Sequence, residues 1–465
     1  MVFDCHSAPV ESVGAVACNK RRVLIVSFYF PPYRTIGALR VGKFAKFLVE
    51  QGWDVRVLSA VDTASPGMPL EVPENLVTRT RWFKIDDLFS RRALMSKLGD
   101  ARSVQTANSS SASSKKDWSG SFSRRLHKIF FLFAYWPDRY IGWRHYAVKA
   151  GDQIIREWRP DIIFASSPPP TSLLVASALA RRHDVPWIAE FRDPWVDNPY
   201  YEYPRWRYYL ERIWERSVLR NCRGVVSVSP IVHEQFNQKY GKPGVVAMNG
   251  FDPNDFPDPS EITPVIEYRL RIVFTGHIYL NYSDPTILFE AIRDLGEEGR
   301  QIKVEFYGTS CEAVLPLAER LGVSSSVSAH AAVDYQESLK IQMSADVLLS
   351  IQWINEKEIS RISAKIFEYM AARRPILAIG YGKGPLTELL ESRHAGVVCE
   401  TSAGILPHLR RWLEQKRGDG VPALPQEVTV GLTRVEQFSN TLRLMEDAIQ
   451  TKSGDKSTDR QEKTT

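Results

Sequence analysis

Short apolar runs alternate with helical patterns along most of the chain. The first run, VLIVS at 23–27, is rich in β-branched residues and predicts a strand that is buried on both faces. Apolar residues then recur at helical spacing from Leu39 to Leu48, Gly52 marks the end of that helix, and a second buried strand is predicted at 55–58. A strand, a helix and a second strand in this order form the unit from which parallel sheets are built.

The same alternation resumes after an interruption at about 62–151 and continues almost to the end of the sequence. A turn signal at 249–252 (NGFD) and a cluster of prolines after it separate two series of such units. We therefore expect an α/β protein of two doubly wound, Rossmann-like domains whose sheets face a central cleft. Further strands are predicted at 161–165, 186–190, 224–229, 245–248, 270–274, 302–307, 346–351 and 376–379, and helices at 171–182, 204–220, 285–295, 311–321, 363–372 and 432–449.

The two series of units define the expected domains of the chain. An N-terminal extension covers 1–20, and the first domain covers 21–250 with a flexible, Ser-rich insertion at 100–124. The second domain covers 251–450. We expect the tail at 451–465 to be disordered because its composition is almost wholly polar.

Composition narrows the class of protein. Hydrophobic residues make up 44% and charged residues 25%, which is typical of a soluble globular protein. The net charge of +6 is too weak to argue for nucleic-acid binding. The five cysteines are scattered, and the sequence has no DxD pair, no clustered Cys or His and no GxxxxGK[ST] loop. We therefore expect a reducing compartment, no metal site and no cofactor.

The most informative stretch surrounds a predicted helix start in the second half. Ser363 is a suitable N-cap, and a helix start with Arg361 and Lys365 beside it suits the phosphates of a ligand. Glu368 lies one turn further along the face of Lys365, where a carboxylate accepts the two hydroxyls of a ribose. These features outline a site for a nucleoside diphosphate. The alternative is an amphipathic helix whose Lys and Glu form a solvated pair.

The sequence at this helix, KIFEYMAARRPILAIG, resembles the donor-site helix of GT-B glycosyltransferases in the retaining family 4. The opening segments VLIVSFYFPP and QGWDVRVLSA are similar to the first unit of that family. WPDRYIGW, RPDIIFASSPPPTS and PWIAEFRDPW resemble a subgroup that acts in surface-polysaccharide assembly. VSVSP, MNGFD and IVFTGHIY continue the resemblance in the same order, so that it covers about 22–449.

The resemblance implies roles for particular donor-side residues. Glu368 matches the second of the paired glutamates in the family and would hold the donor ribose, whereas the first glutamate falls at Ser360, which is a departure. The family's Arg and Lys pair after the GHIY strand is likewise replaced here, since His277 follows Gly276. This leaves Arg361 and Lys365 as the candidates for the diphosphate. The remaining donor-site candidates are Ser363, Gly308 and Gly37, the last in a loop whose backbone approaches the phosphates.

On the acceptor side, the resemblance points to the residues after the strand at 186–190. Asp193 would take the proton of the acceptor hydroxyl or orient the sugar, and Arg192 would steady the leaving phosphate. The alternative for this pair is an ion pair that holds a loop.

The segment 128–146 combines aromatic and basic residues, and the stretch 115–159 carries ten Lys and Arg against four Asp and Glu. Such a segment either belongs to the core or lies on an anionic membrane surface. A lipid-linked acceptor favours the second interpretation. We therefore expect a cytoplasmic protein in peripheral contact with the inner face of the membrane.

The expected function is that of a metal-independent, retaining glycosyltransferase. It would transfer a sugar from a UDP- or GDP-sugar to a saccharide or lipid-linked acceptor in cell-surface polysaccharide biosynthesis. Two alternatives stay open at this point: a hydrolysing nucleotide-sugar epimerase of the same fold, and a non-catalytic subunit that binds a nucleotide sugar.

Overall fold

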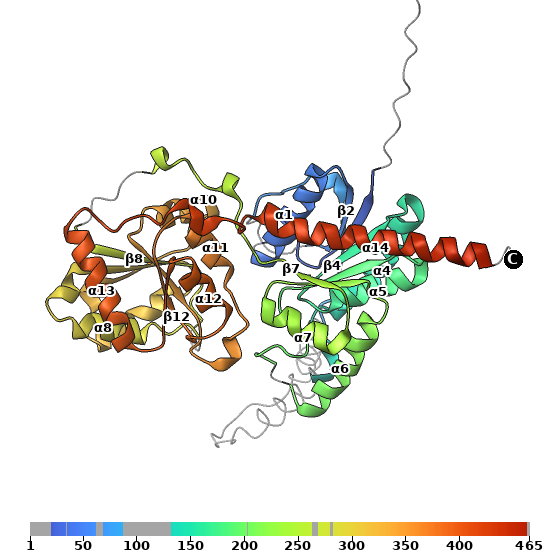
Figure 1. The fold of residues 1–465 in the computed structure, drawn as a ribbon. Helices are drawn as coiled ribbons and strands as arrows, with labels where there is room; N and C mark the ends of the chain where they lie inside the picture. The colour runs from blue at the N-terminus through green and yellow to red at the C-terminus, as the bar shows by residue number, and fades with distance from the viewer. Residues whose placement is uncertain are drawn as a thin grey trace, which may run out of the picture.

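The computed structural model describes residues 20–33, 35–61, 68–86, 132–201, 203–262, 268–279 and 282–462, with side chains up to residue 452. The predicted insertion at 100–124 and almost all of the N-terminal extension lie outside these ranges. Two α/β domains stand side by side in the structure, each with a parallel sheet between layers of helices (Figure 1). The two doubly wound domains expected from the sequence are therefore confirmed.

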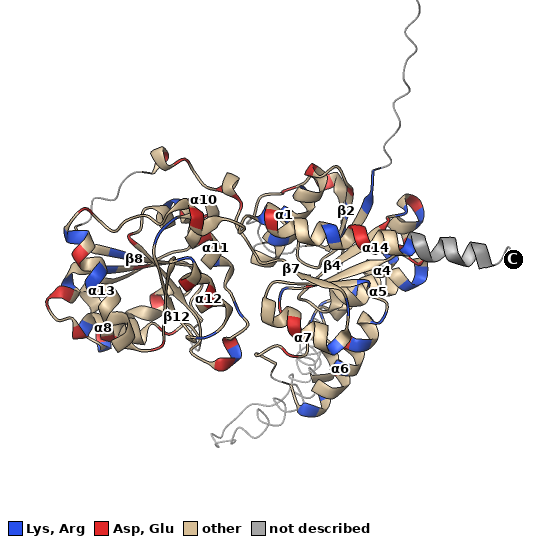
Figure 2. Ribbon diagram, in the orientation of Figure 1, with Lys and Arg blue, Asp and Glu red and all other residues tan. Residues whose placement is uncertain are grey.

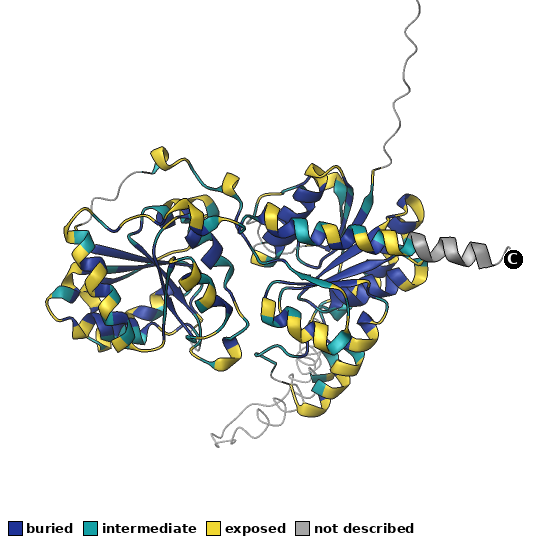
Figure 3. Cartoon of the chain, in the orientation of Figure 1, coloured by how far each residue is buried: buried dark blue, intermediate teal, exposed yellow. Residues whose placement is uncertain are grey.

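The first domain is built on a seven-stranded parallel sheet in the order β3-β2-β1-β4-β5-β6-β7. Its middle strands are buried along their whole length because helices cover both faces (Figure 3). The strands are β1 (Arg22–Val26), β2 (Asp54–Ala60), β3 (Val77–Thr80), β4 (Ile162–Ser167), β5 (Trp187–Phe191), β6 (Gly224–Ser227) and β7 (Gly244–Val246). The helices are α1 (Ile36–Glu50), α4 (Arg144–Trp158), α5 (Thr171–His183), α6 (Arg205–Leu219) and α7 (Pro230–Tyr240).

The second domain has a six-stranded parallel sheet in the order β10-β9-β8-β11-β12-β13. Its strands are β8 (Leu270–Thr275), β9 (Ile302–Tyr307), β10 (Val327–His330), β11 (Val347–Ile351), β12 (Ile376–Ile379) and β13 (Gly396–Cys399). Its helices are α8 (Thr286–Asp294), α9 (Leu315–Arg320), α10 (Tyr335–Met343), α11 (Ala364–Ala371), α12 (Pro385–Ser392) and α13 (Ser402–Arg417). The strand order reverses between β8 and β11, and such a point opens a ligand crevice at the carboxyl ends of the strands.

The last helix, α14 (Arg434–Glu462), leaves the second domain and lies across the first (Figure 1). Phe438 packs on Phe44 and Phe47 of α1, with ring centroids 5.1 and 5.8 Å apart. Met445 is fully buried in the same cluster. The helix therefore completes the core of the first domain, although the sequence analysis grouped it with 251–450.

Helix α14 also covers most of the tail for which we expected disorder. It runs to Glu462 instead of ending near 450. Extending a helix that packing has already nucleated adds one hydrogen bond per residue fixed, so α14 continues although residues 453–459 include Gly, Ser, Thr and Asp, which are poor helix formers. A polar composition alone therefore did not end the helix.

The two connections between the domains lie side by side. The backbone N–H of Phe251 donates to the carbonyl of Leu432 (3.1 Å), and the N–H of Arg434 donates to the carbonyl of Phe251 (2.7 Å). Gly250 adopts a φ of +61°, which an L side chain would oppose at this crossing. Both crossings thus form one short hinge.

The aromatic segment predicted to touch a membrane is largely packed into the first domain where the structure describes it. Trp143 is fully buried, and the hydroxyl of Tyr29 donates to that of Tyr140 (2.5 Å). Phe133, in contrast, is exposed. No helix in the described ranges is long and apolar enough to span a bilayer.

Candidate active site

A pocket of about 140 Å³ lies between the domains, next to the hinge. Its walls come from α1 and the loops after β7 and β8, from α10 and α11, and from the start of α14. The lining residues are Ile36, Leu39, Arg40, Met68, Asn249, Thr275, Gly276, Tyr335, Ser338, Ala364, Lys365, Glu368 and Arg434. The structure thus brings together three of the predicted donor-site residues, Gly276, Lys365 and Glu368.

Lys365 lies on the first turn of α11 and points back over the end of β8. Its ammonium nitrogen is 4.4 Å from the ring centre of Phe274. A Cβ added to Gly276 would stand 2.1 Å from that nitrogen, so the missing side chain makes room for the lysine. Burial lowers the pKa of Lys365 to about 8, and Glu368 offsets part of this effect.

Glu368 lies one turn further along α11 and is linked to the hinge. The hydroxyl of Tyr335 is 3.3 Å from a carboxylate oxygen of Glu368 and 3.3 Å from one of Asp255. Asp255 in turn accepts from Lys43 (2.6 Å) and pairs with Arg434 (3.3 Å). Burial raises the pKa of Glu368, while Arg434 and Tyr335 act against this rise. A polar network therefore joins the expected ribose-binding carboxylate to both inter-domain connections.

Gly37 and Arg192 contact each other in the first domain, next to the pocket residue Ile36 but outside the pocket lining. Gly37 lies in the first turn of α1, whose N-cap Thr35 accepts from the N–H of Ala38 (3.1 Å), so it is not in a loop as we expected. A Cβ at Gly37 would lie 1.5 Å from the guanidinium of Arg192. That guanidinium donates to the carbonyl of Ser167 (3.3 Å), and burial lowers its pKa. Helix α1 begins here because Thr35 satisfies one of its free N–H groups.

Arg361 and Asp193 lie near a direct bridge between the domains. The guanidinium of Arg361 donates to the hydroxyl of Tyr200 (2.8 Å) and lies 3.4 Å from a carboxylate oxygen of Glu358. The Tyr200 hydroxyl also donates to Glu358. Burial would lower the pKa of Arg361, but Glu358, Tyr200 and Asp193 together raise it. Asp193 itself is exposed.

The other predicted donor-site residues shape the surroundings of the pocket. Ser363 is the N-cap residue of α11, but its side chain makes no capping hydrogen bond. His277 packs edge-on against Tyr279, with ring centroids 4.3 Å apart. A Cβ at Gly308 would stand 1.8 Å from the carbonyl oxygen of Gly276, so this glycine permits the close packing of the two loops.

Sequence reasoning missed several polar residues of the site. Arg40 is buried, pairs with Glu190 (2.9 Å) and donates to the carbonyl of Met248 (2.8 Å). The sequence feature that could have identified Arg40 is the presence of an arginine among the apolar positions of α1. Tyr335 and Arg434 come from distant parts of the chain, and no local pattern marks them.

Glu358 was also missed, although it is buried and faces the first domain. The family pattern places the first glutamate eight positions before Glu368, at Ser360. Glu358 lies two residues earlier, in the short helical turn Glu356–Glu358. Among the described residues, no group of three or more His, Cys, Asp and Glu side chains is arranged to hold a metal.

Comparison with known proteins relates the chain to glycosyltransferases. Residues 38–255 match the model of the family described as Glycosyltransferase Family 4. No curated protein sequence matches the chain.

Three solved structures share the fold. HepE of Anabaena in complex with UDP is similar with a TM-score of 0.53 and 14% identity, covering 94% of this chain and 100% of its own. Sucrose-phosphate synthase of Thermosynechococcus elongatus has a TM-score of 0.56 and 13% identity over 94% and 100%. The lipopolysaccharide outer core galactosyltransferase WaaB in its apo form has a TM-score of 0.52 and 11% identity over 93% and 99%.

Proposed function

We propose that this chain is a GT-B glycosyltransferase similar to family 4, and that it transfers a sugar from a nucleotide-diphosphate sugar with retention of configuration. The observation that carries the proposal is the pairing of Lys365 and Glu368 on one face of α11, in a pocket between two Rossmann-like domains. A cation at the helix start and a carboxylate one turn later match the two ends of a ribosyl diphosphate.

In the proposed complex, the donor lies mainly on the second domain. The carboxylate of Glu368 accepts the ribose hydroxyls in place of the Tyr335 hydroxyl that now occupies one of its oxygens. Lys365 and the free N–H groups at the start of α11 hold the diphosphate, with Arg361, Ser363 and the loops at Gly276, His277 and Gly308 around it. We propose that no metal is needed here, because the cationic side chains of Lys365 and Arg361 would offset the charge of the leaving diphosphate.

The first domain contributes the acceptor side. Arg192, placed against Gly37, steadies the developing charge on the leaving phosphate, and Asp193 orients the acceptor or accepts its proton. Attack from the face that the diphosphate leaves accounts for retention, with a phosphate oxygen taking up the proton. Domain closure over the pocket excludes water and so limits hydrolysis of the donor.

We further propose a saccharide or lipid-linked acceptor, a UDP- or GDP-sugar as donor, and a cytoplasmic role in polysaccharide assembly. The support is the resemblance of 136–143, 159–172 and 186–195 to the surface-polysaccharide subgroup. This part of the proposal depends on the sequence resemblance and not on a contact in the structure.

The first experiment is calorimetry with UDP, GDP and their sugars, followed by transfer assays on membrane extracts. We expect Glu368→Ala to weaken nucleotide binding by roughly tenfold or more, since a charged hydrogen-bond acceptor is lost. Lys365→Ala should lower the transfer rate by about a hundredfold or more. Lys383→Ala and Glu388→Ala, at exposed positions of the same domain, are the matched controls.

Wild-type kinetics in both site variants would overturn the assignment. Incubation with the nucleotide sugar alone separates the alternatives: epimerised or freed sugar without any acceptor indicates an epimerase. Tight nucleotide binding without turnover indicates a non-catalytic subunit.

A further inference from the structure

Over residues 205–215, helix α6 buries charged residues and exposes apolar ones, which is the reverse of an ordinary surface helix. Its buried face holds Arg207, Glu211 and Glu215, each at most 1% exposed, and Val218 and Leu219 are buried at its C-terminal end. Exposed residues run along α6 (yellow in Figure 3). They include large apolar side chains: Trp206 (41% exposed), Tyr209 (60%), Leu210 (47%) and Ile213 (68%). A surface helix normally turns its apolar stripe to the core, so this arrangement calls for a physical cause.

The buried face cannot be exchanged for the apolar one by rotating the helix. The guanidinium of Arg207 donates to Glu211 (2.6 Å) and to the carbonyls of Tyr135 (2.5 Å) and Pro137 (3.3 Å). The indole N–H of Trp195 donates to the other oxygen of Glu211 (3.0 Å). Turning α6 would leave the carbonyls of Tyr135 and Pro137 and the indole N–H of Trp195 without their partners inside the protein, which is costly. The apolar residues are therefore held outward.

The outward residues form a continuous apolar patch, which we call the α6 patch: Phe133, Trp206, Tyr209, Leu210 and Ile213. Phe133 is 55% exposed and stacks on Trp206, with ring centroids 5.6 Å apart. Contiguous exposed apolar surface of this kind marks a contact with another molecule or with a membrane.

The charges around the α6 patch decide between these partners. Four arginines of this helix and its C-cap are exposed: Arg205, Arg212, Arg216 and Arg220 (Figure 2 shows basic residues in blue along α6). Both acidic residues of the helix are buried. The outer face of α6 is therefore apolar and cationic, which matches the headgroups and acyl chains of an anionic lipid surface.

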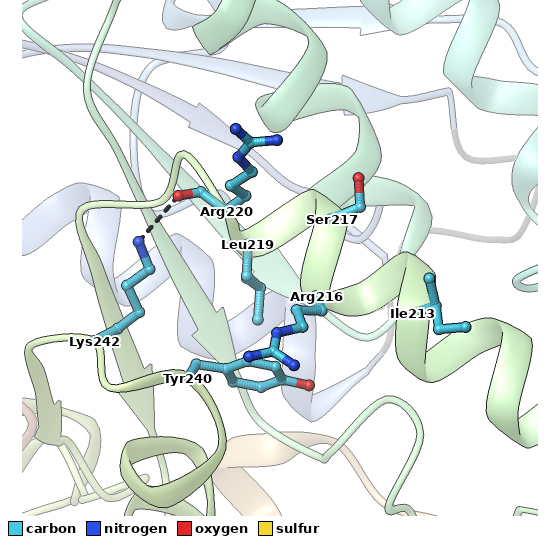
Figure 4. Close-up of a pocket in the computed structure, with 7 residues that line it drawn as sticks. All are labelled: Ile213, Arg216, Ser217, Leu219, Arg220, Tyr240 and Lys242. Carbon is cyan, nitrogen blue, oxygen red and sulfur yellow. Dashed lines mark hydrogen bonds between the residues drawn. The ribbon is translucent and has the colours of Figure 1, made fainter.

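A basic hollow continues the α6 patch at the C-terminal end of the helix (Figure 4). It has a volume of about 430 Å³ and is lined by Ile213, Arg216, Arg220, Tyr240 and Lys242, among others. The ammonium of Lys242 donates to the carbonyl of Arg220 (3.0 Å), which satisfies one of the last carbonyls of the helix. Among the described residues, no carboxylate pairs with Arg216 or Arg220, so both guanidinium groups are available to lipid phosphates.

We propose that the α6 patch and the basic hollow dock this protein on an anionic membrane surface. Leu210 and Ile213 enter the boundary of the acyl chains, Trp206 and Tyr209 lie at the headgroup level, and Arg216, Arg220 and Lys242 bind headgroup phosphates. Because α6 is hydrogen-bonded to the loop that carries Asp193 and Tyr200, docking brings this loop close to the lipid surface. The proposed docking is independent of the proposed transfer reaction. That reaction only supplies a reason for the protein to lie at a membrane.

The test is flotation of the full chain with vesicles of phosphatidylcholine alone and of phosphatidylcholine mixed with phosphatidylglycerol. We expect binding to the anionic vesicles only, weakened by added salt. Arg216→Gln combined with Arg220→Gln should weaken it by roughly fivefold per arginine. Leu210→Ser combined with Ile213→Ser should weaken it by about tenfold. Arg300→Gln and Val430→Ser, exposed on the second domain, are the matched controls.

Several outcomes would overturn the docking. They are equal binding of the wild type to both kinds of vesicle, no binding to either, or unchanged binding of both double variants. A dimer in light scattering that the Leu210 and Ile213 variant abolishes, without vesicle binding by the wild type, would make the α6 patch a self-association surface instead. Calorimetry with UDP and GDP on the same variants should give wild-type affinity, so failure of docking would leave the proposed transfer reaction standing.

Discussion

At the scale of single residues, two cations of the cleft are placed by glycines that make room for them. Lys365 lies against Gly276, and Arg192 lies against Gly37. In both pairs the side chain that is absent matters as much as the one that is present, because a methyl group would occupy the position of the cation. All four residues were predicted as site residues from the sequence, but the contact within each pair was not predicted.

The first prediction concerns the pH dependence of nucleotide binding. Burial lowers the pKa of Lys365 to about 8, and a bound diphosphate should raise it again. Below pH 8 the lysine is charged before and after binding, so affinity is at its maximum there. Above pH 8 binding must first take up a proton, so affinity for UDP or GDP should fall as the pH rises.

Calorimetry in buffers of different ionisation enthalpy should detect this proton uptake in the wild type above pH 8. Lys365→Met should remove both the uptake and this part of the pH dependence. Uptake that persists in the variant would assign the titration to another group.

The second prediction tests the contact of Gly37 with Arg192. Gly37→Ala places a methyl group where the guanidinium now lies, so Arg192 must move away. We expect the transfer rate to fall by about tenfold or more while the melting temperature changes little. Gly404→Ala, at a helix position of the second domain where a Cβ has room, is the control. A transfer rate equal to that of the wild type would show that the position of Arg192 does not matter for the transfer reaction.

At the scale of secondary-structure elements, the central strands were predictable and most of the edge strands were not. The strands β1, β4, β5, β8, β11 and β12 are short runs in which apolar residues dominate, because helices cover both faces of a parallel sheet. Strand β9 was also predicted, although Lys303 and Glu305 interrupt its apolar residues. The edge strands β3, β10 and β13 were not predicted, because each has only four residues and most of these are partly exposed. The edge strand β7 is the exception, since it was predicted at 245–248. Sequence patterns therefore described the centre of each sheet better than its margin.

The candidate site shows the same difference between what local sequence patterns predict and what only the fold brings together. Residues on one local motif, such as Lys365 and Glu368, were predicted from their spacing. Tyr335, Arg434 and Glu358 join the site only in the folded structure, so their spacing in the sequence does not predict them. The assignment of α14 to the second domain failed for this reason too, since the apolar positions of a helix do not say which core they enter.

The third prediction uses the buried acid of α6. Burial raises the pKa of Glu215 from 4.5 to about 8. Between these two values the folded protein keeps a proton that the unfolded chain releases, so the free energy of unfolding falls as the pH rises. Glu215→Gln is neutral throughout and should be the more stable protein above pH 8, by an amount on the order of a few kcal/mol. At pH 5 the advantage should be nearly absent.

Melting temperatures of the wild type and Glu215→Gln across this range provide the measurement. Glu234→Gln, at an exposed position of α7, should show no such trend. A constant difference between Glu215→Gln and the wild type at all pH values would mean that the acid is ionised in the folded protein.

At the scale of the whole molecule, the structure shows the two domains drawn together. The pocket of about 140 Å³ is smaller than the 300 Å³ or more, roughly, that pockets for small ligands usually offer. The bridge from Tyr200 to Glu358 and Arg361 spans the domains directly. On the proposed function, we therefore expect the domains to separate and this bridge to break when a donor enters.

The fourth prediction follows from that bridge. Tyr200→Phe removes the hydroxyl that joins the domains, a loss of about 1–3 kcal/mol for a hydrogen bond to a charged group. We expect a larger radius of gyration by small-angle X-ray scattering in the absence of nucleotide, and a return towards the wild-type value when UDP or GDP is bound. Tyr209→Phe, at an exposed position, should leave scattering unchanged. An unaltered radius in Tyr200→Phe would show that other contacts hold the closed form.

The return of α14 to the first domain makes the second domain an insertion within the sequence of the first. Its two ends meet at Phe251 and Leu432, where the backbones are hydrogen-bonded, so the whole second domain begins and ends at a single point. A segment with adjoining ends is exchangeable as a unit when the substitute matches this junction and the contacts that cross it, such as the bridge from Tyr200 to Glu358 and Arg361. On the proposed division of donor and acceptor sites, we expect donor preference to move with such a substitute between homologues, while the first domain and its closing helix are left as they are.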